Sequence, residues 1–219
     1  MSASDSSLEI ERKYAVDAGF ELPDLSGVPG VAAVTGPRTY HLTAVYHDTP
    51  GLRLAAARIT LRRRSGGTDD GWHLKLPVGA GVRREVHAPL GPGTEDVPAR
   101  LAGLVAKWTG GEPLRPIARL QTTRTVRHLV DTGGQVLAEV ADDEVTGSLP
   151  DRHSGDTDAA GDPAAWPAAT AWREVEIELG RGPAELLDDA GRLLLGAGAR
   201  PSPAASKLSL LLAVAGSQG

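Results

Sequence analysis

The sequence contains no cysteine, so disulfide bonds and cysteine-ligated zinc sites are excluded. Aromatic residues make up only 4% of the chain, a scarcity that we attribute to genome composition. Long apolar runs are also absent: the longest, Leu208 to Ala215, contains Ser209 and is far too short to cross a bilayer. The N-terminus lacks the basic and apolar segments of a signal peptide. We therefore expect a cytoplasmic protein that does not bind membranes.

Positive charge is not in excess either. The formal net charge of −5 argues against a protein that binds nucleic acid through bulk electrostatics. No glycine-rich phosphate loop of either standard pattern occurs, and the six histidines show no metal-ligand spacing. The length of 219 residues allows one large domain or two small ones, and the hydrophobic content of 41% is ordinary for a globular protein.

What the chain does contain begins at Leu8 to Tyr14. Read as a strand, this segment places three charged side chains on one face, because side chains alternate along a strand: Glu9, Glu11 and Lys13. Trp172 to Leu179 alternates in the same way and places three carboxylates on one face: Glu174, Glu176 and Glu178. Such rows are unfavourable to bury unless other charges or a metal meet them.

The segments between these two rows predict a meander of hairpins. Alternation is seen at 58–64, 72–76 and 82–88, and further strands are expected at 40–48, 117–131 and 136–146, which gives roughly eight in all. Helical spacing or composition predicts helices at 98–109, 183–195 and 204–215. The segment 147–171 is rich in Ser, Asp, Pro, Gly and Ala and is expected to be a mobile insert.

The charged face of these strands carries both signs, repeated in strand after strand. If the strands close into a barrel, either face can point inward. The basic residues of such a cavity would bind a polyanion: Arg62, Arg64, Lys75, Arg83 and Arg124. The carboxylate rows would hold a hard cation such as Mg²⁺ or Mn²⁺ through oxygen. The competing interpretation is a solvated outer face, but an all-acidic face repels itself unless cations neutralise it.

Short motifs follow one another along nearly the whole chain: Glu9-x-Glu11-x-Lys13, Tyr46-His47-Asp48-Thr49, Leu61-Arg62-Arg63-Arg64, Leu74-Lys75, Arg83-x-Glu85, Thr123-Arg124, Asp143, Glu174-x-Glu176-x-Glu178 and Ser206-Lys207. Their types and order resemble the CYTH domain, the family of triphosphate tunnel metalloenzymes. The first motif is weak alone, and the specificity comes from the order. The resemblance covers about residues 7 to 212.

The resemblance implies an α+β fold: a closed, eight-stranded antiparallel barrel that forms a charged tunnel, with a few flanking helices. One domain is expected over residues 1–219, with its core at about residues 7 to 212.

The resemblance also implies roles for individual residues. The triphosphate clamp would be Arg62, Arg64, Lys75, Arg124 and Lys207. One or two Mg²⁺ or Mn²⁺ ions would be bound by Glu9, Glu11, Asp143, Glu176 and Glu178. Which two of the three late glutamates are ligands stays open, so Glu174 is a candidate as well. Lys13 would position phosphate or water beside these glutamates, and Glu85 would belong to the second metal or water site.

The implied activity is metal-dependent hydrolysis of a triphosphate, with inorganic triphosphate giving diphosphate and phosphate. Thiamine or nucleoside triphosphates are alternative substrates, class IV adenylate cyclase chemistry is another alternative, and a polyphosphate-binding module without catalysis is the non-enzymatic one. No site for an organic group can be seen in the sequence, while Lys13 and the full acidic set favour catalysis over binding. The expected partner is a small-molecule triphosphate, not nucleic acid or membrane, and the chain is expected to be a monomer or homodimer.

Overall fold

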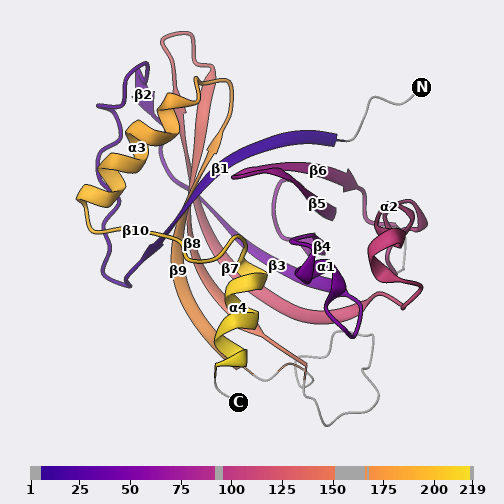
Figure 1. Ribbon diagram of the computed structural model, residues 1–219. Helices are drawn as coiled ribbons and strands as arrows, with labels where there is room; N and C mark the ends of the chain where they lie inside the picture. The colour runs from indigo at the N-terminus through magenta and orange to yellow at the C-terminus, as the bar shows by residue number, and fades with distance from the viewer. Residues whose placement is uncertain (1–5, 92–95, 151–165, 167, 218–219) are drawn as a thin grey trace.

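The computed structural model describes residues 6–91, 96–150, 166 and 168–217. Its strands form one antiparallel sheet, shown in Figure 1, in which two of the ten strands contain only two residues each. The eight long strands are β1 (Ser6–Val16), β3 (Arg38–Asp48), β4 (Thr60–Ser65), β5 (Gly71–Gly79), β6 (Val82–Ala88), β7 (Arg115–Val130), β8 (Val136–Ser148) and β9 (Ala168–Leu179).

The sheet closes on itself because β1 has a partner at each end of the strand order. Residues 6–10 of β1 pair with β6, and residues 11–16 pair with β9. The order β1-β6-β5-β4-β3-β7-β8-β9 therefore returns to β1. This confirms the closed, eight-stranded antiparallel barrel. The short strands β2 (Ala33–Val34) and β10 (Arg200–Pro201) pair with β7 and β1.

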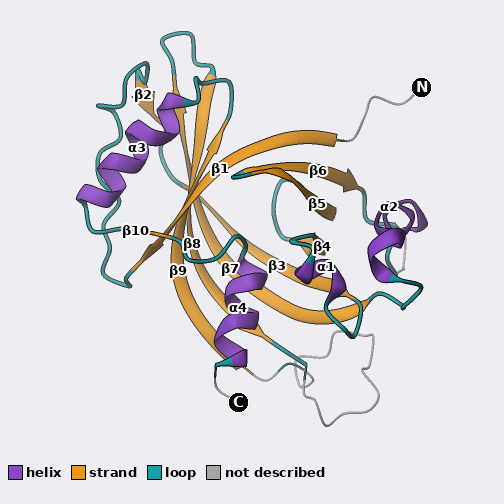
Figure 2. Ribbon diagram, in the orientation of Figure 1, coloured by secondary structure: helices purple, strands orange, loops and turns teal. Residues whose placement is uncertain are grey.

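The described residues contain four helices, shown in purple in Figure 2: α1 (Arg53–Ala56), α2 (Ala99–Thr109), α3 (Glu185–Gly196) and α4 (Lys207–Gly216). The last three confirm the expected helices, and each begins one to three residues later than expected. In the described part of the chain, no helix combines the length and the apolar character needed to cross a membrane.

The short helix α1 was not expected, and Asp48 explains it. The buried Asp48 carboxylate accepts hydrogen bonds from the backbone N–H groups of Thr49 at 2.6 Å, Leu54 at 2.9 Å and Ala55 at 2.8 Å. Leu54 and Ala55 lie in the first turn of α1, where N–H groups have no backbone partner, so the carboxylate stabilises this helix. The aspartate of the Tyr46-His47-Asp48-Thr49 motif thus has a structural role.

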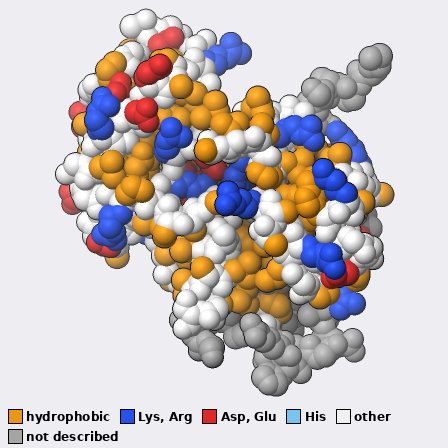
Figure 3. Space-filling model, viewed as in Figure 1, with side chains coloured by type: hydrophobic (Ala, Val, Ile, Leu, Met, Phe, Trp, Pro, Cys, Tyr) orange, Lys and Arg blue, Asp and Glu red, His pale blue; other side chains and the backbone are white. Residues whose placement is uncertain are grey.

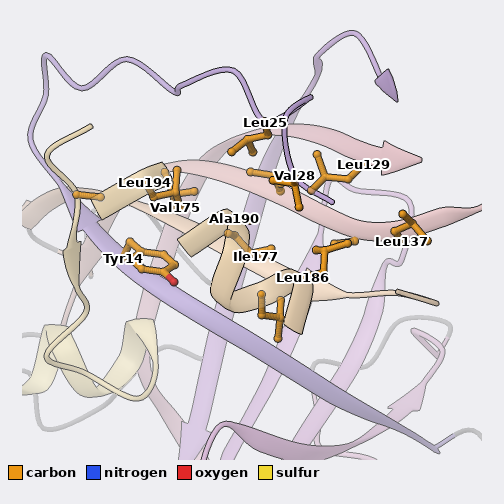
Figure 4. Packing of buried hydrophobic residues seen from close by; sticks show 14 of the residues in the cluster. Tyr14, Leu25, Val28, Leu129, Leu137, Val175, Ile177, Leu186, Ala190 and Leu194 are labelled. Atoms are coloured by element: carbon orange, nitrogen blue, oxygen red, sulfur yellow. The ribbon is translucent and has the colours of Figure 1, made fainter. Parts of the chain in front are cut away.

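The apolar face of most strands points outward, where helices cover it. On one side α3 packs Leu186, Ala190 and Leu194 against Tyr14, Val175 and Ile177 (Figure 4). On another side α2 packs Leu101 and Val105 against Leu61, Trp72 and Leu74. Because the apolar side chains bury themselves outside the barrel wall, the charged side chains of the same strands are left facing inward.

Helix α4 packs differently, against inward-facing residues. Its Leu208 and Leu211 are buried among Ala118, Leu120 and Val145. Val145 lies two positions after Asp143 on β8 and therefore on the same face. Figure 1 shows α4 in front of the concave side of the long strands. The helix fills this part of the barrel with leucines and carries Lys207, its first residue, to the charged part.

Two expected boundaries were wrong. The strand expected from Arg58 begins at Thr60, because Arg58 has φ of 58°, in the left-handed region that strands do not use. The expected insert at 147–171 is strand at both ends, since β8 runs to Ser148 and β9 starts at Ala168. The rest of that expectation, residues 151–165 and 167, lies outside the described residues.

Candidate functional site

The barrel encloses a cavity of about 450 Å³ to which all eight long strands and α4 contribute side chains. Twelve of the fourteen site residues expected from the sequence line it: Glu9, Glu11, Lys13, Arg62, Arg64, Lys75, Arg83, Glu85, Arg124, Glu176, Glu178 and Lys207. The other two, Asp143 and Glu174, are buried in contact with Lys207. The structure therefore brings all fourteen side chains to one place, and their roles stay predictions.

Strand register explains which charges meet. Directly opposed residues of two paired strands share a face, and their side chains are neighbours. Lys13 is opposite Glu176 across the β1–β9 pair, and Glu11 is opposite Glu178. Asp143 is opposite Arg124 on one side and Glu174 on the other. The strand register therefore places the charged side chains of each of these strands beside those of its neighbour.

The most buried cluster is built around Lys207. Its Nζ lies 2.8 Å from Asp143 Oδ2 and 2.7 Å from carboxylate oxygens of both Glu174 and Glu176. Burial acts to lower the pKa of Lys207, but the three carboxylates outweigh it and raise that pKa. Arg124 completes the cluster with a bidentate pair to Asp143 at 2.8 and 2.7 Å. Asp143 is fully buried and pairs with both of these cations.

Glu176 lies at the centre of the charged network. It contacts Lys13 and Lys207, and its Oε2 lies 2.8 Å from Arg124 Nη2. Burial would raise its pKa, but these cations hold the pKa of Glu176 well below its usual value. Lys13 also donates to Glu11 at 2.8 Å. Burial favours neutral Lys13, but Glu176 and Glu11 outweigh it and raise the Lys13 pKa, so the ammonium stays charged.

A second acidic group lies where β1 pairs with β6. Glu9 and Glu85 share a hydrogen bond, and Lys75 Nζ lies 2.7 Å from Glu9 Oε2. Burial, followed by the hydrogen bond with Glu85, raises the pKa of Glu9 to about 8. For Glu85, burial would raise the pKa, but His73 Nδ1 at 2.8 Å and Lys75 lower it. Glu9 therefore holds the proton of this pair and Glu85 is ionised.

The raised pKa of Glu9 predicts a pH effect on stability. The proton that Glu9 holds in the folded protein leaves the unfolded chain at a pKa near 4.5, so folding takes up a proton between there and about pH 8. The contribution of Glu9 to stability therefore falls as the pH rises through this window. With a chelator present, we expect the melting temperature of the wild type to fall from pH 5 to pH 8 relative to that of Glu9→Gln, whose amide cannot ionise. Parallel melting curves for the two proteins would contradict the assignment.

Arg62 and Arg64 form the basic side of the cavity. Arg62 Nη1 contacts Tyr46 Oη at 3.3 Å, and Arg64 pairs with Asp69 in the loop between β4 and β5. Burial, then the neighbouring Arg62 and Arg124, lower the pKa of Arg64 to about 9. Burial is the main cause of this shift, and repulsion from the two neighbouring guanidinium groups adds to it. An anion entering the cavity would relieve that repulsion.

The carboxylates fit a divalent cation. Oxygens of Asp143, Glu174 and Glu176 lie within 4.8 Å of one another, although Lys207 Nζ contacts all three. Glu178 forms no ion pair with a described side chain, and burial raises its pKa. Glu9 Oε2 is buried and lies 2.7 Å from Lys75 Nζ. Carboxylate oxygens gathered in one cavity are the donor type that a hard cation requires, and a bound cation would compete with the lysines for them.

Three further residues were not expected at the site. His73 contacts Glu85 through Nδ1 and the Asp69 carbonyl through Nε2 at 2.9 Å. Asp69 pairs with Arg64, and the Trp172 indole N–H donates to Glu174 at 2.7 Å. The sequence did indicate His73, because it lies two positions before Lys75 and therefore on the same strand face. For a loop aspartate the sequence carried no comparable sign.

The match to a family model covers residues 7–200 and is described as the CYTH domain. The chain belongs to the CYTH family. Proteins from two strains of Mycobacterium tuberculosis, both described as uncharacterized, are 42% identical over 209 residues, which is 94% of this chain but 40% of each relative. The chain thus spans less than half the length of those relatives.

Solved structures share the CYTH fold. A protein of Bacillus halodurans, described as a candidate adenylate cyclase, has a TM-score of 0.54 at 17% identity and covers 93% of this chain and 97% of its own. A candidate adenylyl cyclase from Hippeastrum, described as having a dominant triphosphatase activity, has a TM-score of 0.54 at 17% identity over 94% and 96% of the two chains. At this identity the likeness establishes the fold.

Proposed function

We propose that this CYTH domain hydrolyses a triphosphate with the help of a divalent cation, and that its substrate is inorganic triphosphate. The observation that carries the proposal is the cluster of Arg62, Arg64 and Arg124 in a closed cavity, with the pKa of Arg64 lowered to about 9 by burial and its neighbours. The triphosphatase activity described for the Hippeastrum protein supports the same assignment.

The basic residues of the cavity would bind the triphosphate. A guanidinium presents N–H donors in a fork that matches phosphate oxygens, whereas an ammonium acts as a point charge. Arg62 and Arg64 would bind one end of the phosphate chain, with Lys75 and Arg124 beside it. Arg83 and Lys207 also line the cavity. Lys207 is held by three carboxylates, so we assign it to positioning Glu176.

Glu9, Glu11 and Glu178 would hold Mg²⁺ or Mn²⁺ on the acidic side, with Glu176 adjacent. Bound there, the cation would neutralise phosphate oxygens and favour ionisation of the attacking water. Lys13 stays protonated and neutralises charge beside these glutamates. Glu85 stays ionised, so it orients the water by accepting a hydrogen bond and is a weak base.

The reaction itself is a simple displacement. The water oxygen forms a bond to a terminal phosphorus, and the bridging P–O bond breaks with its electron pair going to the diphosphate. The water proton is lost to solvent or to the products. Phosphoryl transfer of this kind depends on positioning and charge neutralisation more than on covalent chemistry by the protein, which is what the cavity offers.

A phosphate-release screen tests the proposal. The protein is incubated with inorganic triphosphate, thiamine triphosphate or ATP, each with Mg²⁺ or Mn²⁺, and orthophosphate is measured. We expect release to be fastest with inorganic triphosphate and to stop with a chelator. Formation of cyclic AMP from ATP would instead identify a cyclase, and tight binding of polyphosphate without turnover would identify a binding module.

The ion pair between Arg64 and Asp69 predicts a gain of affinity. The Asp69 carboxylate occupies a guanidinium that we assign to phosphate, and Asp69 lines the cavity. An incoming phosphate must displace it, so Asp69→Asn is expected to tighten binding of inorganic triphosphate several-fold, as measured by calorimetry without metal. Asp70→Asn is the control, because Asp70 accepts only from the Gly67 N–H at 3.0 Å. Equal affinities in all three proteins would show that Asp69 does not compete with the ligand.

A further inference from the structure

A second cavity, of about 270 Å³, lies where β1 changes partner and is lined by residues of β1, of the β5–β6 hairpin and of the segment before α4. Pairing of β1 with β6 ends at Ile10, and pairing with β10 begins at Tyr14. Between them this edge is held only by the Glu11 N–H to Gly81 carbonyl contact at 3.4 Å and the Ser202 N–H to Lys13 carbonyl bond at 2.9 Å. We name this cavity the side chamber.

The side chamber adjoins the central cavity. Three residues line both: Glu11, Lys13 and Arg83. The Arg83 guanidinium donates to the Ala205 carbonyl, and its Nε lies 4.0 Å from Glu11 Oε1, so this one side chain stands at the boundary. Figure 3 shows basic and acidic side chains in a hollow near the centre of the face where Figure 1 places β1 and the start of α4. The two cavities therefore share a boundary that includes Lys13.

The side chamber is lined by more basic than acidic residues. Arg12 and Arg58 line it together with Arg83 and Lys13, against Glu11 as its one acidic lining residue. Lys13 is already engaged with Glu11 and Glu176. Arg12 has only a loose pair with Asp188 at 3.6 Å, with both side chains well exposed. Two guanidinium groups are thus available for an anion from outside.

Arg58 is held in place by its backbone. Its φ of 58° is unfavourable for any residue other than glycine. Two backbone hydrogen bonds maintain this conformation: the Arg58 N–H donates to the Ala55 carbonyl at 2.9 Å, and the Ile59 N–H donates to the Leu54 carbonyl at 2.8 Å. This turn directs the exposed Arg58 side chain to the chamber instead of into the strand that follows.

The volume limits the ligand. A cavity of about 270 Å³ is smaller than the roughly 300–1,000 Å³ of sites for drug-sized molecules. With arginine donors and no aromatic lining residue, it suits a small tetrahedral oxyanion with its water. We propose that the side chamber binds orthophosphate and is the route by which this product leaves the barrel.

The binding half of the inference stands on the chamber alone, and the release half rests on the proposed hydrolysis. Because α4 fills one part of the barrel and diphosphate would remain on the arginine clamp, orthophosphate formed near Lys13 needs a separate way out. The chamber begins at that lysine. Arg12 and Arg58 would attract the anion outward through their positive charge.

Calorimetry tests binding. Orthophosphate is titrated into the full chain saturated with inorganic triphosphate, with a chelator present so that the central cavity is filled and nothing turns over. We expect orthophosphate still to bind, about tenfold more weakly in Arg58→Gln and weaker again when Arg12→Gln is added. Arg84→Gln is the matched control. Arg84 is exposed on the β5–β6 hairpin, which lines the side chamber, but its own side chain lines neither cavity.

The outcomes separate this inference from the proposed function. If the wild type binds no orthophosphate under these conditions, or if Arg84→Gln weakens it as much as Arg58→Gln, the chamber is not a phosphate site. If inorganic triphosphate itself does not bind, the proposed function fails, and the comparison of Arg58→Gln with Arg84→Gln still decides the inference.

Product inhibition tests the route. Orthophosphate should inhibit hydrolysis non-competitively in the wild type, and its inhibition constant should rise about tenfold in Arg58→Gln while KM for triphosphate changes less than about twofold. Purely competitive inhibition that is equal in both proteins would overturn the route.

Discussion

Replacing Glu11 with alanine is expected to reduce hydrolysis of inorganic triphosphate about 1,000-fold. The Glu11 carboxylate is buried, accepts a hydrogen bond from Lys13, and lies opposite Glu178 on the acidic wall that we assign to the cation. Loss of a metal ligand removes several kcal/mol of charge stabilisation, and each 1.36 kcal/mol changes the rate tenfold. Initial rates of phosphate release at saturating Mg²⁺ measure the effect.

The fold should survive this change. Lys13 keeps Glu176, and Arg83, whose Nε lies 4.0 Å from Glu11 Oε1, keeps the Ala205 carbonyl, so each cation beside Glu11 retains an acceptor. Glu112→Ala is the control, because Glu112 also pairs with a cation, Arg53 at 2.7 Å, but on the surface. A Glu11→Ala protein that keeps its melting temperature and near-normal hydrolysis would show that the metal assignment is wrong.

Replacing Lys207 with methionine is expected to have the largest effect on stability. A cation in the first turn of a helix is disfavoured by the helix dipole, so α4 gains nothing from this lysine. Its partners are the three carboxylates of Asp143, Glu174 and Glu176. Removing one member of a buried ion pair costs about 3 to 5 kcal/mol, because the remaining charge is left unpaired. For a protein of this size we expect the melting temperature to fall by about 10 °C.

Divalent cations should partly reverse this loss. The three carboxylates have oxygens within 4.8 Å of one another, and without the ammonium they offer a site for Mg²⁺. We expect Mg²⁺ to raise the melting temperature of Lys207→Met more than that of the wild type. Lys107→Met is the control, since Lys107 is exposed on α2, with its Nζ 4.0 Å from the centre of the Trp108 ring. An unchanged melting temperature in Lys207→Met would contradict the ion-pair network.

Much of the site could be predicted because most of its side chains are on β-strands. Glu9, Glu11 and Lys13 alternate with apolar residues, and so do the late glutamates, which fixes the face on which each side chain lies. The structure agrees with that face for each of them. The arginines Arg62 and Arg64 follow the same rule. Local alternation is determined by backbone geometry, so it can be read without knowledge of the neighbours.

Contacts made by loops and helix ends could not be predicted. Asp69 reaches Arg64 from a loop whose path depends on Gly66, where a Cβ would lie 1.9 Å from the His41 carbonyl oxygen. Lys207 is a lone lysine at the start of an apolar helix, and nothing local indicates that it enters a charged cluster. The side chamber depends on where β1 exchanges β6 for β10, which is a property of three segments together.

The sequence by itself determined that charged rows and apolar rows occupy opposite faces of the strands, because that follows from a period of two residues. It also determined the barrel and the family, through the order of the motifs. Only the tertiary structure decided which charges meet. Glu176 contacts Lys13, Arg124 and Lys207, three cations from β1, β7 and α4, because strand register and helix packing bring them together. Those distances set the pKa values on which the proposed chemistry depends.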